Sequence, residues 1–347
     1  MRRPIVVKLG TSLVAGPGGR VRRALLRARA REIGELVRGG RPTVVVSSGA
    51  IALGLPRLGL ERRPRSVPRL QAASALGQAR LQAAWEAALA KEGLAVAQVL
   101  LTAADMADRT AYVNARNALA ELFRLGAVPV VNENDATATD EITFGDNDAL
   151  AAQVAVLTGA QLLVLLTEVE GVYTHAPESP DAELVEEGGL AFGAAFGEGT
   201  ALGRGGMQSK VLAAQLAAAA GIPTVIAAGR GDDVLGPIVA GERRGTRFPS
   251  GESRDSAFKL WLRYCKPSAG RLLVDDGARR AVVEGGASLL AAGVVGVEGT
   301  FGPGDAVDLV GQDGSPFAKG IAEAPPGELA GRPRGVEAVH RNRLVLL

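Results

Sequence analysis

The sequence predicts an α/β protein: a three-layer α/β/α sandwich with a largely parallel sheet, followed by a small, mainly β domain. Two patterns lead to this prediction. In the first part of the chain, short apolar runs alternate with longer, Ala-rich segments of helical length. After residue 268, short apolar runs are separated by Gly-rich turns instead. Apolar strands that alternate with helices indicate a parallel sheet covered on both faces, whereas closely spaced strands with turns indicate a β module.

Six runs that are short, apolar and mostly bounded by Gly or Pro are predicted to be buried strands: residues 4–9, 43–46, 96–101, 128–132, 162–167 and 224–227. Five segments between and after them are predicted to be helices: residues 22–38, 68–91, 109–125, 147–157 and 207–220. In sheets of this kind, ligands bind beyond the carboxyl ends of the strands. Functional residues are therefore expected where these strands end.

A polar stretch at residues 248–256, rich in Pro, Gly and Ser, predicts the end of the first domain. The expected division is a first domain of residues 1–255, a linker of residues 256–268 that includes a helix-like segment at 257–264, and a β domain of residues 269–347. Its short apolar runs predict strands at residues 272–274, 281–283, 294–297, 306–309 and 343–347.

Composition excludes several classes of protein. Of the 347 residues 47% are hydrophobic, which is enough to bury a large core. The net charge of +2 provides no overall field that would attract nucleic acid. The single cysteine, Cys265, excludes an intramolecular disulfide framework. The apolar run after Arg3 is shorter than the roughly 7–15 residues of a secretion signal, and no run reaches the ~18 residues of a membrane span. We therefore expect a soluble, cytoplasmic protein.

The ends of the first two predicted strands carry the first candidate residues. Lys8 is followed by Gly10, Thr11 and Ser12, a setting in which a lysine can meet a phosphate, although a solvent-facing lysine is the alternative. The segment SSGAIA at residues 47–52 follows the second strand. Its small residues and free N–H groups can bind a carboxylate, but for the segment taken alone a serine helix cap with a packing glycine is the favoured interpretation.

Two clusters of acidic and amide side chains follow further along the chain. The segment NEND at residues 132–135 closes the fourth strand, and GDND at residues 145–148 opens the next helix. Asp and Asn are turn formers and helix caps, so at least one member of each cluster is expected to be structural. The others can bind a substrate amino group or orient a catalytic lysine.

The most specific local feature is the segment GRGGMQSK at residues 203–210, a glycine-rich turn that runs into a helix with Lys210 in its first turn. Backbone N–H groups and the helix dipole favour a phosphate at such a position. The segment is not a Walker A motif, because lysine does not directly follow the last glycine. A flexible surface loop is the alternative interpretation.

In order and spacing, the segments KLGTS, SSGAIA, NEND, GDND and GGMxSK resemble the glutamate 5-kinases of the amino-acid kinase superfamily. The closing segment at residues 335–341 is similar to the G-x-x-A-V-H-R ending of that family. The resemblance implies the sandwich fold followed by a PUA domain, a small β fold found in RNA-modifying enzymes. It also implies ATP-dependent phosphorylation of the γ-carboxylate of L-glutamate, the first step of proline biosynthesis.

The resemblance further implies roles for individual residues. Lys8 and Lys210 match phosphate-binding lysines, and Asp148 matches the acidic residue that orients them. The residues that match glutamate-binding positions are Ser48, Asp135 and Asn147. The residues that fall on nucleotide-binding segments, besides the two lysines, are Thr167, Glu168, Arg204, Gly205, Gly206, Met207, Gln208 and Ser209. Two of these depart from the family pattern: Glu168 stands where aspartate is usual, and Arg204 where a small or hydroxylated residue is usual.

Cofactors and partners follow from the same resemblance: ATP with Mg²⁺ bound mainly through its phosphates, proline as a feedback inhibitor sensed by the loop at residues 135–146, and a homodimer or homotetramer. Two alternatives stay open. One is a related kinase that acts on another carboxylate or on a carbamate. The other is an RNA-binding protein with a degenerate kinase domain, which the lack of a dense basic stripe and the scarcity of aromatic residues in the C-terminal region disfavour.

Overall fold

The computed structural model describes residues 2–137, 146–189, 206–251, 257–264, 266–333 and 335–347. The candidate residues Arg204 and Gly205 lie outside these ranges. The chain divides into two compact units, Met1–Ser253 and Arg254–Leu347.

The first unit is built on a seven-stranded sheet in the order β5-β6-β4-β1-β7-β8-β9. Neighbouring strands are parallel except for β8 and β9, so the prediction of a largely parallel sheet is confirmed. All six predicted strands are present. The strands are β1 (Ile5–Leu9), β4 (Thr43–Ser47), β5 (Val96–Leu101), β6 (Val128–Glu133), β7 (Leu162–Thr167), β8 (Thr224–Ala228) and β9 (Thr246–Phe248). A separate two-stranded ribbon joins β2 (Ala15–Gly16) to β3 (Arg20–Val21).

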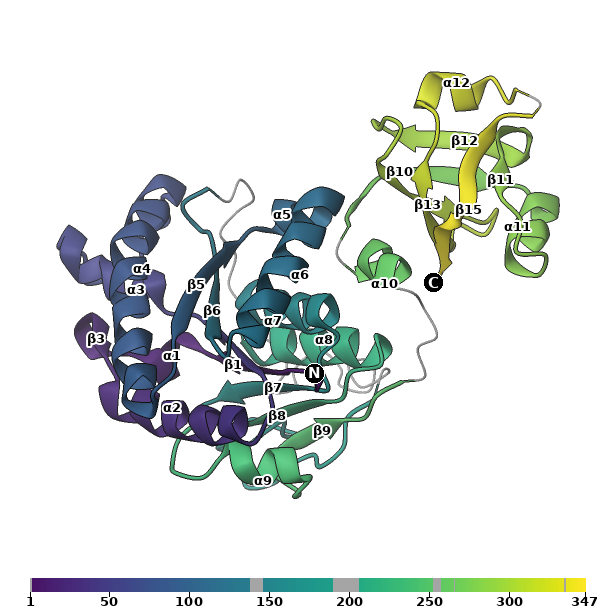
Figure 1. Cartoon of the computed structure of the whole chain (residues 1–347). Helices are drawn as coiled ribbons and strands as arrows, with labels where there is room; N and C mark the ends of the chain where they lie inside the picture. The colour runs from purple at the N-terminus through teal and green to yellow at the C-terminus, as the bar shows by residue number, and fades with distance from the viewer. Residues whose placement is uncertain (1, 138–145, 190–205, 252–256, 265, 334) are drawn as a thin grey trace. The chain divides into compact units, whose positions relative to one another are not determined.

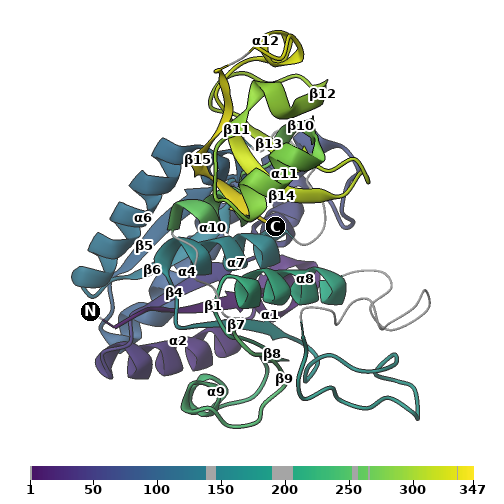
Figure 2. The same cartoon turned by 90° about the vertical axis from the view of Figure 1, so that its right-hand side faces the viewer.

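Helices cover both faces of this sheet, as the sandwich prediction requires (Figures 1 and 2). One face packs on α2 (Arg23–Arg38), α4 (Val67–Leu89) and α9 (Leu235–Ala240), whose apolar side chains form one core with those of the strands. The other face packs on α7 (Asp146–Thr158) and α8 (Gly206–Ala219), with α6 (Arg109–Arg124) beside α7. Shorter helices are α1 (Thr11–Val14), α3 (Ala50–Gly54) and α5 (Ala103–Ala107).

The central strand β1 is buried along its whole length, and its alternation decides which way Lys8 points. Ile5, Val7 and Leu9 belong to the core that includes α2 and α4. Because successive side chains of a strand face opposite sides, Lys8 faces the layer that contains α7 and α8. The sequence therefore sends one charged side chain from the middle of the sheet toward the N-terminal ends of these two helices.

Helices α3 and α4 approach each other more closely than side chains normally permit. A Cβ atom on Gly54 would lie 1.8 Å from the carbonyl oxygen of Ala73, and one on Gly77 would lie 1.8 Å from that of Ala50. Only glycine fits at either position, because both obstacles are backbone atoms. This crossing fixes the segment that follows β4, where the candidate residue Ser48 lies.

The second unit contains a six-stranded sheet in the order β11-β15-β14-β13-β10-β12 around its own apolar core. Its elements are α10 (Ala257–Tyr264), β10 (Ser268–Val274), α11 (Asp276–Val283), β11 (Leu289–Leu290), β12 (Val294–Gly299), β13 (Ala306–Val310), β14 (Pro316–Ala322), α12 (Pro326–Ala330) and β15 (Glu337–Leu346), drawn in green to yellow in Figure 1. Helix α10 packs on β14 and β15. The mainly β prediction for this part of the chain is confirmed.

One predicted strand of this unit is wrong. Residues 281–283 form the last turn of α11 rather than a strand. The helix is started by Asp275, whose carboxylate accepts a hydrogen bond from the backbone N–H of Ala278 at 2.8 Å. The apolar triplet is too short to separate a strand from the buried side of a helix, and the capping residue decides the outcome.

We predict that Gly77→Ala destabilises the protein by about 3 kcal/mol, because the added methyl group collides with backbone at the α3–α4 crossing. Gly34→Ala on α2 is the matched control, since its added Cβ would mainly meet the movable side chains of Arg38 and Glu92. Denaturant unfolding of both variants measures the difference. Equal stability of the two variants would contradict the close approach.

Candidate active site

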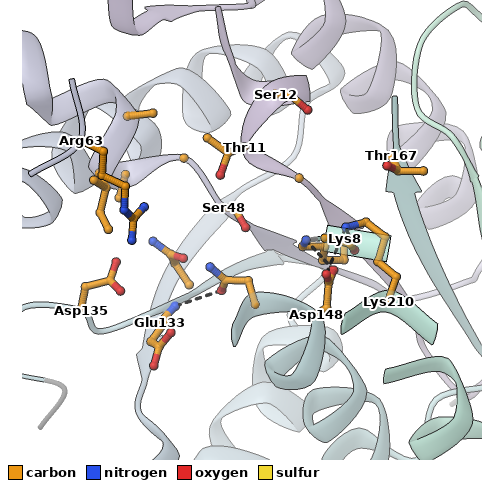
Figure 3. Close-up of a pocket in the computed structure, with 18 of the residues that line it drawn as sticks. Lys8, Thr11, Ser12, Ser48, Arg63, Glu133, Asp135, Asp148, Thr167 and Lys210 are labelled. Atoms are coloured by element: carbon orange, nitrogen blue, oxygen red, sulfur yellow. Dashed lines mark hydrogen bonds and ion pairs between the residues drawn. The ribbon is translucent and has the colours of Figure 1, made fainter. Parts of the chain in front are cut away.

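The carboxyl ends of the central strands surround a cavity of about 490 Å³, which is where parallel sheets place their ligands (Figure 3). Most of the predicted site residues line it. Those that do are Lys8, Ser48, Asp135, Asn147, Asp148, Thr167, Gly206 and Lys210. Glu168, Met207, Gln208 and Ser209 are described but are not among the residues that line it.

Two lysines and one aspartate form the most tightly connected group in the cavity (Figure 3). The Lys8 ammonium lies 2.5 Å from Oδ1 of Asp148, and the Lys210 ammonium lies 3.1 Å from Oδ2 of the same carboxylate. All three are buried, with exposures of 4% for Lys8, 1% for Asp148 and 7% for Lys210. The group therefore places two buried positive charges around one negative charge.

Each member of this group has a local reason for its position. Lys8 is the fourth residue of β1, and Asp148 lies in the first turn of α7. Lys210 is the fifth residue of α8, and its ammonium donates a hydrogen bond to the carbonyl oxygen of Gly206, the first residue of that helix, at 2.8 Å. The neighbouring Ser209 hydroxyl donates to Oδ2 of Asp148 at 2.8 Å. Three elements that are distant in sequence thus meet at a single carboxylate.

The electrostatics of the group follow from burial and from this pairing. Burial would raise the pKa of the Asp148 carboxyl, but the charges of Lys8 and Lys210 outweigh it and hold that pKa below its usual value. Burial lowers the pKa of Lys8, while the carboxylate of Asp148 opposes this shift and the charge of Lys210 adds to it. The pKa of Lys8 therefore depends directly on its partner.

The other end of the cavity carries acidic and amide groups. Asp135 is buried, and its Oδ2 accepts a hydrogen bond from the hydroxyl of Ser74 on α4 at 2.7 Å. The Oδ1 atom of Asn147 accepts one from the backbone N–H of Glu133 at 3.3 Å, which ties the start of α7 to the end of β6. Ser48 lies between the two ends (Figure 3), and its backbone N–H donates to the carbonyl oxygen of Leu9 at 3.1 Å.

The predicted nucleotide segments are only partly gathered at the cavity. Thr167 ends β7 and lines the cavity beside Lys210 and Gly206. The side chain of Glu168 is partly exposed and forms an ion pair with Arg230. Met207 and Gln208 lie in the first turn of α8.

Sequence reasoning did not identify Arg63, which lines the cavity and lies on the same side as Asp135 in Figure 3. It belongs to an irregular segment between α3 and α4, which lies beyond the motifs and after no predicted strand. Asn132 was noted within the NEND segment without a role. It is buried, lines the cavity and donates from Nδ2 to Oε1 of Gln78 at 2.8 Å. Only the spatial position of α4, which carries Gln78, reveals this contact.

Among the described residues, no three His, Cys, Asp or Glu side chains come together in a group that could hold a metal ion. No helix in the described part of the chain combines the length and the apolar character needed to cross a bilayer.

Comparison with known proteins agrees with this architecture. Residues 3–228 match the amino acid kinase family, and residues 270–341 match the PUA domain. A protein named glutamate 5-kinase from Methylobacillus flagellatus is 43% identical over 99% of this chain and 97% of its own length. Another protein of that name, from Paraburkholderia xenovorans, is 42% identical over 99% of this chain and 98% of its own length.

Among solved structures, a UMP kinase from Bacillus anthracis matches with a TM-score of 0.52 and 15% identity over 72% of this chain and 97% of its own. At this identity the likeness concerns the fold alone. The family match and the full-length relatives carry the assignment: the chain belongs to the amino acid kinase family, within the group of the glutamate 5-kinases.

Proposed function

We propose that this protein is a glutamate 5-kinase, which transfers the γ-phosphoryl group of ATP to the side-chain carboxylate of L-glutamate. The observation that carries the proposal is the group of Lys8, Asp148 and Lys210. Two buried ammonium ions share one carboxylate, so the site holds an excess of positive charge away from bulk water. Such a site favours an anion with several charged oxygens, and a transferring phosphoryl group is such an anion.

The opposite end of the cavity supports an amino acid as the acceptor. The carboxylate of Asp135 and the amide of Asn147 offer hydrogen-bond acceptors for an α-amino group, and Ser48 lies between them and the lysines. In this arrangement the α-amino group of glutamate lies toward Asp135, and its side-chain carboxylate points toward Lys8 and Lys210. The names of the full-length relatives agree with this choice of substrate.

The chemistry needs little more than alignment and charge neutralisation. A glutamate carboxyl group has an ordinary pKa of about 4.3, so it is already ionised at neutral pH and needs no general base. No histidine is among the described residues that line the cavity, which agrees with this. The carboxylate attacks the γ-phosphorus in line, the bond to the β–γ bridging oxygen breaks, and glutamyl 5-phosphate and ADP are formed.

In this mechanism Lys8 and Lys210 contact the oxygens of the transferring group and reduce the repulsion between carboxylate and triphosphate. Asp148 fixes both ammonium groups through its two oxygens, and Ser209 fixes Asp148 in turn. The start of α8 adds backbone N–H groups beside Lys210. Mg²⁺ supplies further neutralisation of the phosphates. Both oxygens of Asp148 face lysines, and we propose that Mg²⁺ enters with ATP and is bound mainly through the phosphates.

The remaining proposals rest on the family. We propose that the reaction serves proline biosynthesis in the cytoplasm, that proline inhibits it, and that the protein forms a homodimer or homotetramer. The loop proposed to sense proline begins at Asp135, but its residues 138–145 lie outside the described residues.

An acid panel tests the choice of substrate. With ATP, Mg²⁺ and hydroxylamine, we expect the protein to form a hydroxamate from glutamate, because hydroxylamine traps the acyl phosphate. Aspartate, N-acetylglutamate and carbamate are the competing acceptors. Turnover of carbamate is measured by the release of ADP. Turnover of one of these, with none of glutamate, would replace the proposed substrate by another member of the superfamily.

We expect Lys8→Ala and Lys210→Ala each to lower kcat by about 10²–10³-fold, because each removes a charge from the transferring group. Steady-state kinetics measures the effect, and circular dichroism confirms that each variant is folded. Lys91→Ala replaces an exposed lysine outside the cavity and serves as the control. Turnover near the wild-type value in either cavity variant would refute its assignment.

Asp148→Asn tests the dependence of Lys8 on its partner. Removal of the carboxylate takes away the contribution that raises the pKa of Lys8, so this pKa falls further below its usual value. Lys8 then loses its proton at a lower pH, so the alkaline limb of the pH profile of kcat moves to lower pH. Misplacement of the two ammonium groups also lowers kcat by about 10²-fold. Glu121→Gln, which breaks an exposed ion pair on α6, is the control. An unmoved alkaline limb in Asp148→Asn would contradict the coupling.

A further inference from the structure

A second buried ion pair lies on α2, and no step of the proposed mechanism uses it. The guanidinium of Arg29 is fully buried and donates from Nη2 to Oε1 of Glu32 at 2.7 Å. It also donates to two backbone carbonyl oxygens of the segment after β8, to Gly231 at 2.7 Å and to Gly229 at 3.4 Å. Arg29 of α2 therefore holds the backbone of this segment at two carbonyl groups.

Glu32 holds the other end of the same segment. Its two carboxylate oxygens accept hydrogen bonds from the backbone N–H groups of Val234 at 3.0 Å and Leu235 at 2.8 Å. Four hydrogen bonds to the backbone thus fix residues 229–235 between β8 and α9. A buried ion pair is weak evidence for stability alone, because desolvation offsets its attraction. Its clear structural effect here is to fix this loop.

The fixed loop lies against the end of β7, next to the cavity. The backbone N–H of Gly229 donates to the carbonyl oxygen of Thr167 at 2.7 Å. A Cβ atom on Gly229 would lie 2.4 Å from Cδ1 of Leu13 and 2.9 Å from Cβ of Leu166, so the two segments are in close contact. Thr167 lines the cavity, and the residue after it is Glu168.

Arg230 belongs to this loop, and its side chain forms an ion pair with Glu168, the residue after Thr167. Both side chains are about half exposed, and such a pair contributes little to folding stability. Glu168, however, directly follows Thr167, which lines the cavity together with Gly206 and Lys210. Without a counter-charge, the Glu168 carboxylate would repel a triphosphate bound there.

We propose that Arg230 is a positioning residue for the nucleotide: it neutralises Glu168 and orients its carboxylate, and the buried Arg29–Glu32 pair fixes the loop that carries it. The inference rests on the proposed function, in which ATP binds at this end of the cavity. It assigns to the loop after β8 a part in ATP binding that acts through Glu168 and not through contact with the phosphates.

A double-mutant cycle on the full-length chain tests this role. The variants are Arg230→Ala, Glu168→Gln and the two together, and Mg·ATP affinity is measured by calorimetry, with KM for ATP and for glutamate measured in parallel. We expect Arg230→Ala to weaken ATP binding about three- to tenfold, because an unpaired carboxylate then faces the nucleotide. The KM for glutamate stays unchanged. In the Glu168→Gln background, Arg230→Ala changes ATP affinity less than about twofold, since no charge is left to neutralise.

Two further variants sharpen the cycle. Arg230→Lys keeps the positive charge and retains most of the ATP affinity. Arg124→Ala breaks the exposed Arg124–Glu121 pair on α6 and leaves ATP affinity at the wild-type value.

Three outcomes would overturn the proposal: an equal loss of ATP affinity from Arg230→Ala with and without Glu168→Gln, no loss in either background, or an equal rise in KM for glutamate. The cycle is separate from the proposed function. If the wild-type protein binds ATP but does not phosphorylate glutamate, the proposed function fails, and the affinities still decide the role of Arg230.

Discussion

The structure of the site depends on one interaction, the carboxylate of Asp148 placed between the ammonium groups of Lys8 and Lys210. Burial disfavours each of these charges, and only their mutual pairing makes the group tolerable inside the protein. The pairing is incomplete, because two positive charges meet one negative charge. That imbalance is what makes the cavity attractive to a phosphoryl group.

The fold supplies the positions that this interaction requires. Strand β1 runs through the middle of the sheet, so the end that carries Lys8 is flanked by the ends of β4 and β7. Helices α7 and α8 begin beside it and bring Asp148 and Lys210 near their N-terminal ends. On the opposite layer, the glycines of the α3–α4 crossing fix the segment after β4 that contains Ser48. The polar end of the cavity, with Asp135 and Asn147, completes a site with opposite charge character at its two ends.

Much of this arrangement could be predicted from the sequence. Strand ends and helix starts are marked by local patterns, and a parallel sheet brings them to one edge, whereas the resemblance to the glutamate 5-kinases is what implied Asp148 as the partner of Lys8 and Lys210. Contacts that depend on tertiary packing could not be predicted. Gln78 of α4 contacts Asn132 of β6 across 54 positions of sequence, and Arg230 contacts Glu168 across 62. The apolar residues 281–283 of α11 do not distinguish a helix from a strand, because a three-residue apolar run carries no period.

A structure of the protein with glutamate and a non-hydrolysable ATP analogue shows directly whether the two lysines hold the transferring phosphoryl group. We expect both ammonium groups within hydrogen-bond distance of γ-phosphate oxygens, about 2.7–3.2 Å. We also expect the glutamate side-chain carboxylate in line with the γ-phosphorus and the α-amino group near Asp135. A γ-phosphate bound elsewhere, with Lys8 and Lys210 still paired to Asp148 alone, would show that the two lysines do not act on the phosphoryl group.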